Sequence, residues 1–393
     1  MNRKKIIIVG AGASGLMAAI AAAEKGASVT ILEQNDRPGR KLLATGNGRC
    51  NLTNLGIDPD AYHGTDTDFC RDALRFLPVS DTIRFFSKLG IYTRNKDGWI
   101  YPGSMQASSV LELLLLKAQD LGIRIRTGTR AEQLIPGWTV KVPGWEYEAD
   151  AVILACGSRA SGITGSDGSG YELARMAGHT IVKPLPALTG LVSKETPAWG
   201  GVRAYGRVTL FSDDHVAAEE SGELQLTEYG ISGIPVFQIS SRAIRALDEG
   251  RTIHVSLDFV PDFSLQELRA FLKVRQEDCP YKHEKDLFTG MLPDKLCGIL
   301  AKTADPAAAA KDYRLTITAG RPFETAQVCS GGVRTSEVDP VTMESRLAKG
   351  LYFAGELLDI DGPCGGYNLQ WAWSSGACAG HFAACMDEED NVR

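Results

Sequence analysis

The sequence predicts an α/β fold: a Rossmann-like dinucleotide-binding domain that is discontinuous in the chain, with an inserted antiparallel β domain and a small helical domain. Three observations lead to this prediction. A buried apolar strand at residues 6–9 runs into a glycine-rich turn and a helix, as in a βαβ unit. Short alternating strands begin after residue 188. A second buried strand followed by glycine, residues 351–355, returns near the C-terminus and completes the first domain.

The first βαβ unit carries the pattern Gly-x-Gly-x-x-Gly between a strand and a helix. These glycines supply a tight turn, a close approach of backbone to a pyrophosphate and helix packing, and the helix N-terminus favours the negative charge. The next strand, 28–32, ends on Glu33, whose carboxylate can accept both hydroxyls of an adenosine ribose, so FAD or NAD is favoured over NADP. The residues predicted to bind the dinucleotide here are Gly10, Gly12, Ala13, Ser14, Gly15 and Glu33.

The elements that follow belong first to the same α/β domain and then to the insertions. After the first unit we expect a helical stretch near 66–89, a helix near 105–121, a strand at 124–126, a hairpin near 138–147 and a strand at 151–155. Short strands at 190–192, 207–211, 223–227 and 253–258 then indicate an antiparallel β module. A capping box at 264–267 and an Asp-Pro pair at 305–306 open helices of a small helical module.

The return near the C-terminus distinguishes a flavoprotein of the two-dinucleotide-binding type from a simple nicotinamide dehydrogenase. A strand at 351–354 leads to Gly355 and Glu356, and the loop 361–368 leads into a helix at 369–385. The positive end of that helix can stabilise negative charge on a reduced flavin ring. The cofactor-binding residues predicted from this half are Cys156, Gly157, Gly355, Glu356, Gly365, Gly366, Tyr367, Asn368 and Leu369.

A loop at residues 38–54 carries the other chemical signal. Its glycines allow backbone to approach a planar ring, its asparagines can match the edge of an isoalloxazine, and its cations face no acidic residue between positions 36 and 58. We therefore expect the loop to bind pyrophosphate or an anionic substrate and to lie at the flavin ring, with these cofactor-binding residues: Arg40, Lys41, Gly46, Asn47, Gly48, Arg49, Cys50 and Asn51. With FAD as the cofactor, the expected domains are FAD binding at 1–188 and 331–393, antiparallel β at 189–262 and 312–330, and helical at 263–311.

Composition narrows the class further. The chain has 393 residues and a net charge of −6, which gives no general attraction to nucleic acid. Its nine cysteines include no Cys-x-x-Cys pair and no zinc pattern, so we expect a reducing cytoplasm, no disulfide reductase and no metal site. The apolar, Ala-rich N-terminal stretch is broken by polar residues, and cleavage there would delete the phosphate loop. Neither secretion nor a membrane span is therefore expected.

Several longer strings carry a family resemblance. They are 10–15, 38–41, Thr45-Gly-Asn-Gly-Arg-Cys-Asn51, Cys329-Ser-Gly-Gly-Val333 and 355–356 through Gly365-Gly-Tyr-Asn-Leu-Gln370. With these strings the chain resembles, over almost its whole length, the BaiN/YhiN flavoproteins, which are labelled NAD(P)/FAD-dependent oxidoreductases. The resemblance implies non-covalent FAD, a three-module layout and flavin redox chemistry. Family members are associated with ring C=C reduction in bile-acid intermediates, dihydrouridine formation in ribosomal RNA and oxidation of aminoacetone.

The working hypothesis is an FAD-dependent oxidoreductase that reduces an activated C=C bond of a ring. Its substrate would be a uracil of 23S rRNA or a 3-oxo-Δ4 steroid or bile-acid intermediate. No second clean glycine fingerprint is present, so NAD(P)H would visit transiently as the electron donor. An aminoacetone-type amine oxidase using O₂ and a non-catalytic, FAD-dependent RNA- or ribosome-binding protein are the alternatives. The oligomeric state is left open.

Such a reductase delivers hydride from flavin N5 and needs a proton donor opposite the ring. The candidates are Cys50, Cys364, Tyr101, Tyr367 and Cys329. Cys364 and Cys50 are favoured because they lie in the two loops expected at the ring. The six histidines all lie outside these loops, so no histidine base is expected. If the substrate is RNA, Arg203 and Arg207, in a stretch without acidic residues from 196 to 212, are the best candidates for a basic surface.

Overall fold

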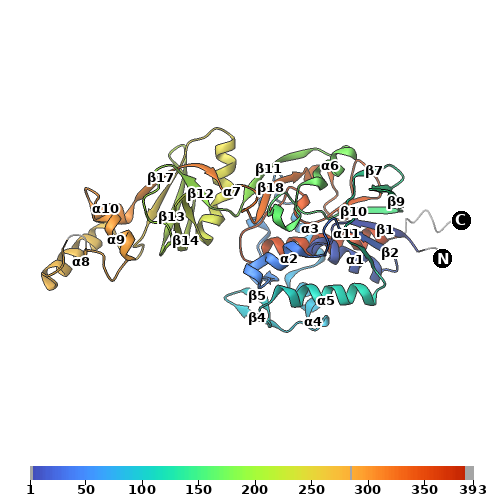
Figure 1. Cartoon of the computed structure of the whole chain (residues 1–393), viewed down its shortest axis with the longest axis horizontal. Coiled ribbons are helices and arrows are strands. Elements are labelled where there is room, and N and C mark those ends of the chain that lie inside the picture. Colours follow the sequence, from blue (N-terminus) through green and yellow to red (C-terminus); the bar gives the residue numbers. More distant parts are fainter. Residues whose placement is uncertain (1–2, 284–285, 386–393) are drawn as a thin grey trace. The chain divides into compact units, whose positions relative to one another are not determined.

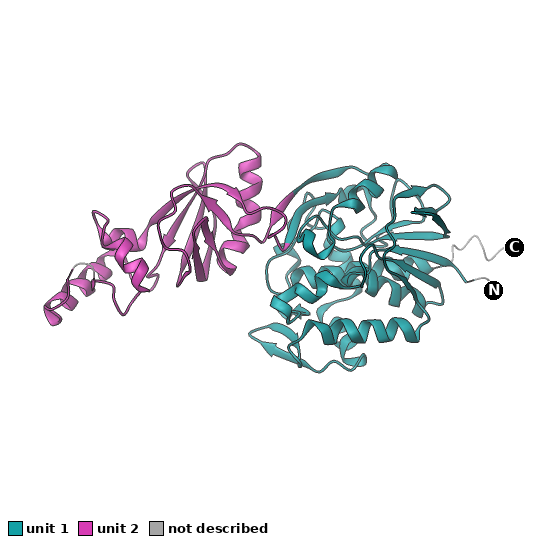
Figure 2. Ribbon diagram, in the orientation of Figure 1, with its two compact units in different colours: residues 1–184, 328–393 teal, residues 185–327 magenta. Residues whose placement is uncertain are grey.

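The computed structural model describes residues 3–283 and 286–385, which form two compact units (Figure 2). Unit 1 comprises residues 1–184 and 328–393, and unit 2 comprises residues 185–327. Each unit has a hydrophobic core of its own. No helix among the described residues is both long and apolar enough to cross a membrane.

Unit 1 is built on a five-stranded parallel sheet with the order β19-β10-β1-β2-β6. The three inner strands are nearly continuous apolar runs, as expected for strands covered on both faces. The strand that returns from the C-terminal part, β19, pairs with β10, so the ends of the chain share one sheet. These strands are β1 (Lys5–Val9), β2 (Ser28–Leu32), β6 (Arg124–Arg126), β10 (Ala151–Leu154) and β19 (Leu351–Phe353).

Two long helices pack on each other in this unit: α1 (Ala13–Glu24) and α11 (Tyr367–Ala384) (Figure 1). Both have apolar or small residues around most of their circumference and are almost completely buried. Gly376 and Gly380 of α11 lie against the backbone of α1, where an added Cβ would come within 2.4 Å of the Ser14 oxygen and 2.1 Å of the Ala18 oxygen. The two helices therefore touch backbone to backbone.

The remaining elements of unit 1 surround the sheet and these helices. The helical stretch expected near 66–89 is two helices, because Pro78 forces the preceding Leu77 out of the helical region and caps the second helix. The elements are α2 (Arg40–Ala44), β3 (Thr53–Asn54), α3 (Cys70–Phe76), α4 (Val79–Lys88), β4 (Thr93–Lys96), β5 (Trp99–Pro102), α5 (Ala107–Asp120), β7 (Gln133–Ile135), β8 (Thr139–Val142), β9 (Trp145–Glu148), α6 (Ser169–Met176), β11 (Ile181–Ala187) and β18 (Val328–Val333).

Unit 2 contains a closed antiparallel barrel with the order β12-β15-β14-β13-β16-β17. The hairpin of β13 and β14 is longer than the short strands expected, and it turns at Asp213 and Asp214, both at positive φ, as a two-residue hairpin loop requires. Its strands are β12 (Leu191–Ser193), β13 (Val202–Ser212), β14 (His215–Thr227), β15 (Gly230–Ser232), β16 (Ile253–Asp258) and β17 (Tyr313–Gly320).

A helix that the sequence analysis missed, α7 (Ile234–Asp248), packs on the barrel. Its buried residues Val236, Ile239 and Ala243 recur at helical spacing, which is the signal that could have revealed it. The small helical module holds α8 (Leu265–Asp278), α9 (Asp294–Leu300) and α10 (Pro306–Lys311). The predicted capping box at Ser264 and the N-cap at Asp305 are both confirmed.

Candidate functional site

The glycine-rich turn between β1 and α1 forms the first half of the site. A Cβ at Gly10 would come within 2.4 Å of the Ala155 oxygen, and one at Gly15 within 2.0 Å of the Gly10 oxygen. These two glycines are therefore required by packing. Gly12, the N-cap of α1, differs because an added Cβ there would meet no atom within 4 Å. Gly12 therefore has an open side at the start of α1.

Glu33 is held beside this turn at the carboxyl end of β2. Its side chain is buried, and Oε2 accepts a hydrogen bond from the Ala11 N–H at 2.9 Å. The other oxygen, Oε1, accepts from the backbone and side-chain N–H groups of Asn35 at 2.8 and 2.7 Å. The carboxylate is thus fixed next to the turn, as the predicted role in binding ribose hydroxyls would need.

The two loops predicted to lie at a flavin ring are brought together at the N-terminus of α11. We call residues 38–54 the first loop and residues 361–368 the second loop. Asn54 Nδ2 donates to the Gly365 oxygen at 2.9 Å, and a Cβ at Gly366 would come within 2.8 Å of the Thr53 oxygen. Inside the helix, Gln370 accepts a hydrogen bond from the Thr53 hydroxyl at 2.6 Å. The first loop is therefore anchored on the helix that the second loop opens.

Asn51 is the one residue of the first loop whose side chain is buried without a partner. It is 6% exposed, and both amide atoms, Oδ1 and Nδ2, lack a hydrogen bond among the described residues. A buried amide without partners costs free energy, on the order of 1–3 kcal/mol, so such groups usually face a ligand or water. The orphaned amide, together with the open side of Gly12, fits a dinucleotide whose ring edge offers donors and acceptors, as FAD does.

Two of the three cations of the first loop have partners elsewhere in unit 1. Lys41 Nζ lies 2.5 Å from Glu356 Oε2, which also accepts from the Ser158 hydroxyl at 3.0 Å. Arg40 donates to the Asn35 side chain at 3.1 Å and to the Ile163 oxygen at 2.8 Å. The first loop has no acidic residue of its own, and the acidic partner of Lys41 comes from a segment that is distant in the sequence.

The predicted proton donors differ in their surroundings. Cys50 is fully buried, and burial raises the pKa of its thiol to about 12. The Tyr367 hydroxyl donates to the Gly56 oxygen at 2.7 Å, and burial raises its pKa. Cys364 is half-buried in the second loop. Burial also raises the pKa of Cys156 to about 12, and none of the nine cysteines, all described, forms a disulfide.

A histidine that sequence reasoning set aside lies beside the second loop. His63 and Asp361 exchange both backbone hydrogen bonds, at 2.7 and 3.0 Å, and His63 Nδ1 lies 3.6 Å from Asp361 Oδ2. The neighbouring Asp359 accepts two hydrogen bonds from Thr65. Because these residues are about 300 positions apart, no local motif could have indicated the contact.

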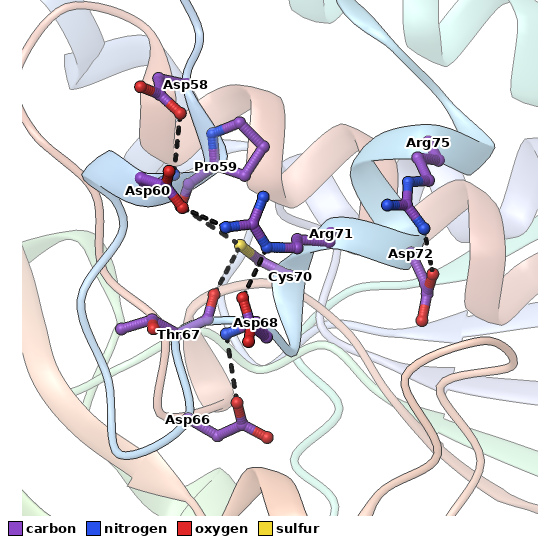
Figure 3. Close-up of polar contacts among 10 residues, drawn as sticks. All are labelled: Asp58, Pro59, Asp60, Asp66, Thr67, Asp68, Cys70, Arg71, Asp72 and Arg75. Carbon is purple, nitrogen blue, oxygen red and sulfur yellow. Dashed lines mark hydrogen bonds and ion pairs between the residues drawn. The ribbon is translucent and has the colours of Figure 1, made fainter.

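The structure brings together no group of three or more potential metal-ligating side chains within residues 3–283 and 286–385. An aspartate-rich segment at 58–72 is organised instead by hydrogen bonds and ion pairs (Figure 3). Arg71 pairs with Asp60 and, at 2.6 Å, with Asp68, and Asp66 accepts from the Asp68 N–H at 3.1 Å. The arginine takes the place at which a cation could be bound.

A parallel sheet with a glycine turn at a helix N-terminus, completed by a strand and helix from the end of the chain, defines a Rossmann-type nucleotide-binding protein. The HI0933-like protein Rossmann domain matches residues 4–382, so the chain belongs to the HI0933-like family. The predicted α/β fold class, the BaiN/YhiN resemblance and the assignment to flavoprotein oxidoreductases are confirmed.

Two relatives match this chain over nearly the full length of both proteins. The chain is 46% identical to a 3-dehydro-bile acid delta(4,6)-reductase of Clostridium scindens, covering 98% of this chain and 99% of that protein. It is 30% identical to a ribosomal RNA dihydrouridine synthase of Escherichia coli, covering 96% and 98%. Among solved structures, 3-ketosteroid delta1-dehydrogenase from Sterolibacterium denitrificans is similar in fold, with a TM-score of 0.53, 12% identity and coverage of 98% and 100%.

The open side of Gly12 leads to a first prediction. We expect Gly12→Val to lose bound FAD, because the new side chain would extend from the start of α1, where the pyrophosphate is expected, and its Cβ would meet no atom within 4 Å. Flavin absorbance per protein after gel filtration measures the loss. Gly298→Val in α9 is the matched control, since its Cβ also meets no atom within 4 Å. Full flavin content in the Gly12 variant would contradict the assignment.

Asn51 gives a second prediction with two opposite readouts. Asn51→Leu has nearly the same volume and removes a buried amide without partners, so we expect the flavin-free protein to keep or gain thermal stability. The same change should weaken FAD binding by about ten- to hundredfold, as loss of hydrogen bonds worth roughly 1–3 kcal/mol implies. Thermal unfolding of apoprotein and fluorescence titration with FAD measure the two effects. Destabilised apoprotein with unchanged FAD affinity would show that the amide is structural.

Proposed function

We propose that this protein is an FAD- and NAD(P)H-dependent reductase that saturates a C=C bond conjugated to a ring carbonyl, with a 3-oxo-Δ4 steroid acid as the substrate class. The observation that carries the proposal is the meeting of the two glycine-rich loops at the N-terminus of α11, beside the unpartnered Asn51. The full-length similarity to a bile-acid reductase supports the substrate class.

The residues that would hold the cofactor divide along its length. Glu33 and the turn at 10–15 would hold the adenosine and pyrophosphate, and Lys41 of the first loop pairs with Glu356. Asn51 and the N-terminus of α11 would face the ring. When bound, FAD would supply hydride transfer. NAD(P)H is proposed as its transient reductant, since the chain has no second glycine fingerprint.

For the proton, we propose the Sγ of Cys364. It is the half-buried thiol of the second loop, whereas Cys50 is fully buried. A thiol that is protonated at neutral pH can donate to the carbon next to the one that receives hydride.

A uracil of ribosomal RNA is the second candidate substrate, favoured by the similarity to RNA dihydrouridine synthases. It offers the same C=C bond conjugated to a carbonyl. The proposed basic surface for RNA is weakened by the fold, because Arg203 pairs with Glu223 at 3.0 Å and Arg207 lies 3.6 Å from Glu219 across the β13–β14 hairpin. The stretch without acidic residues is thus neutralised by its partner strand.

The test of the proposed reaction compares acceptors. We expect the anaerobically reduced holoprotein to be reoxidised rapidly by a 3-oxo-Δ4 steroid acid, and much more slowly by O₂ or by a uracil-containing rRNA fragment. Stopped-flow flavin absorbance measures all three rates, after reduction by NADH and by NADPH in parallel. Faster reoxidation by the RNA fragment would favour the second candidate, and faster reoxidation by O₂ would favour an oxidase.

The proton donor gives a separate prediction. We expect Cys364→Ala to slow reoxidation by the steroid roughly 100-fold or more, the usual contribution of a positioned general acid, while reduction by NAD(P)H stays unchanged. Cys385→Ala, which removes an exposed thiol, is the control. Unchanged reoxidation in the Cys364 variant would assign the proton to another group, with His63 beside Asp361 as the next to replace.

A further inference from the structure

A hairpin formed by β4 and β5 presents two cations and two aromatic rings on one face. Arg94 lies opposite Tyr101, and Lys96 lies opposite Trp99. Directly opposed residues of an antiparallel pair project from the same face, as do residues two positions apart on one strand. The four side chains therefore share a face, which we call the hairpin face. The intervening Ile100 is buried on the other side.

The hairpin face borders both loops of the candidate site. A Cβ at Gly365 of the second loop would come within 2.9 Å of the Trp99 ring, and one at Gly46 of the first loop within 3.8 Å of the Tyr101 ring. Arg49 of the first loop is close enough to Tyr101 to oppose the rise in the tyrosine pKa that burial causes. The two rings thus continue the surface at which the ring of the cofactor would lie.

The cations on and beside the hairpin face are free to pair with a bound anion. Arg49, Arg94 and Lys96 are exposed, and none of the three forms an ion pair with another residue in the part of the chain that the structure describes. This separates them from Lys41, which is paired with Glu356 beside the first loop. A carboxylate that approached the hairpin face would meet unpaired cations next to aromatic rings.

Negative charge lies on the other side of the second loop, in the segment that leads into α3. The segment 58–75 holds five aspartates against two arginines, which pair with three of them (Figure 3). It contacts the second loop through the His63–Asp361 bridge. A polyanion such as ribosomal RNA would be repelled by this acidic segment, whereas a molecule with one carboxylate needs only the few cations of the hairpin face.

We propose that the hairpin face is the recognition surface for the substrate, packing a fused ring system against Trp99 and Tyr101 and pairing its single carboxylate with Arg94 and Lys96. This inference rests on the proposed function and adds to it a specificity element. It assigns preference for the acid over a neutral steroid to two residues outside the predicted cofactor loops.

The test uses holoprotein and two probes that differ only in charge: a 3-oxo-Δ4 steroid with a side-chain carboxylate, and its methyl ester. Calorimetry measures binding of each, without turnover. We expect wild type to prefer the acid and the double variant Arg94→Gln/Lys96→Gln to bind the acid about tenfold more weakly, with ester binding unchanged. The preference should also fall with added salt. Lys302→Gln, an exposed change in unit 2, is the control.

The outcomes separate this inference from the proposed reaction. Preference for the acid that the double variant abolishes supports the hairpin face, even if neither probe is reduced and the proposed reaction fails. Equal affinity of wild type for acid and ester, or an unchanged preference in the double variant, overturns it. Binding of a uracil-containing oligonucleotide in place of both probes, lost in the double variant, also overturns it and assigns the surface to RNA.

Discussion

The packing of α1 against α11 is the contact on which the site depends. At Gly376 and Gly380 the two helices approach so closely that an added Cβ would fall within 2.4 Å of an α1 carbonyl oxygen. The N-terminus of α1 follows the glycine turn, and the N-terminus of α11 follows the second loop. Since both N-termini favour negative charge, their fixed separation sets where a charged, extended cofactor can lie.

Polar residues of the buried helix α11 hold the first loop in place through hydrogen bonds. Gln370 donates to the Leu77 oxygen and to the Thr82 hydroxyl, both at 2.9 Å, and accepts from Thr53. Trp373 donates to the Leu52 oxygen at 2.9 Å. Because each of these groups is buried, loss of a partner would leave a costly unsatisfied atom, so the first loop is held in one position. Asn51 is exceptional within this network because its amide is left without a partner.

Signals that are local in sequence predicted much of the fold and part of the site. The strand at 28–32, the strand at 253–258 and the caps at Ser264 and Asp305 are reproduced because each depends on neighbouring residues. Contacts between distant residues had no such signal. Lys41 meets Glu356 only in the folded chain, and Arg203 meets Glu223 only when β13 pairs with β14. The approach of His63 to Asp361 had no local signal.

The same reasoning explains why charge near this site must be counted in three dimensions. Of the three loop cations expected to bind an anion, Lys41 is paired with Glu356 and Arg40 is bonded to the 163–165 turn, which leaves Arg49. The hairpin of β4 and β5 supplies further positive charge near the loops. Its register places Arg94 and Lys96 on the same face as Trp99 and Tyr101. Positive charge next to the loops therefore comes from β4, which contains no basic sequence motif. Two aromatic rings lie on the same face of the hairpin. For the flat, singly charged substrate proposed above, the rings would supply a packing surface and the cations a partner for the carboxylate.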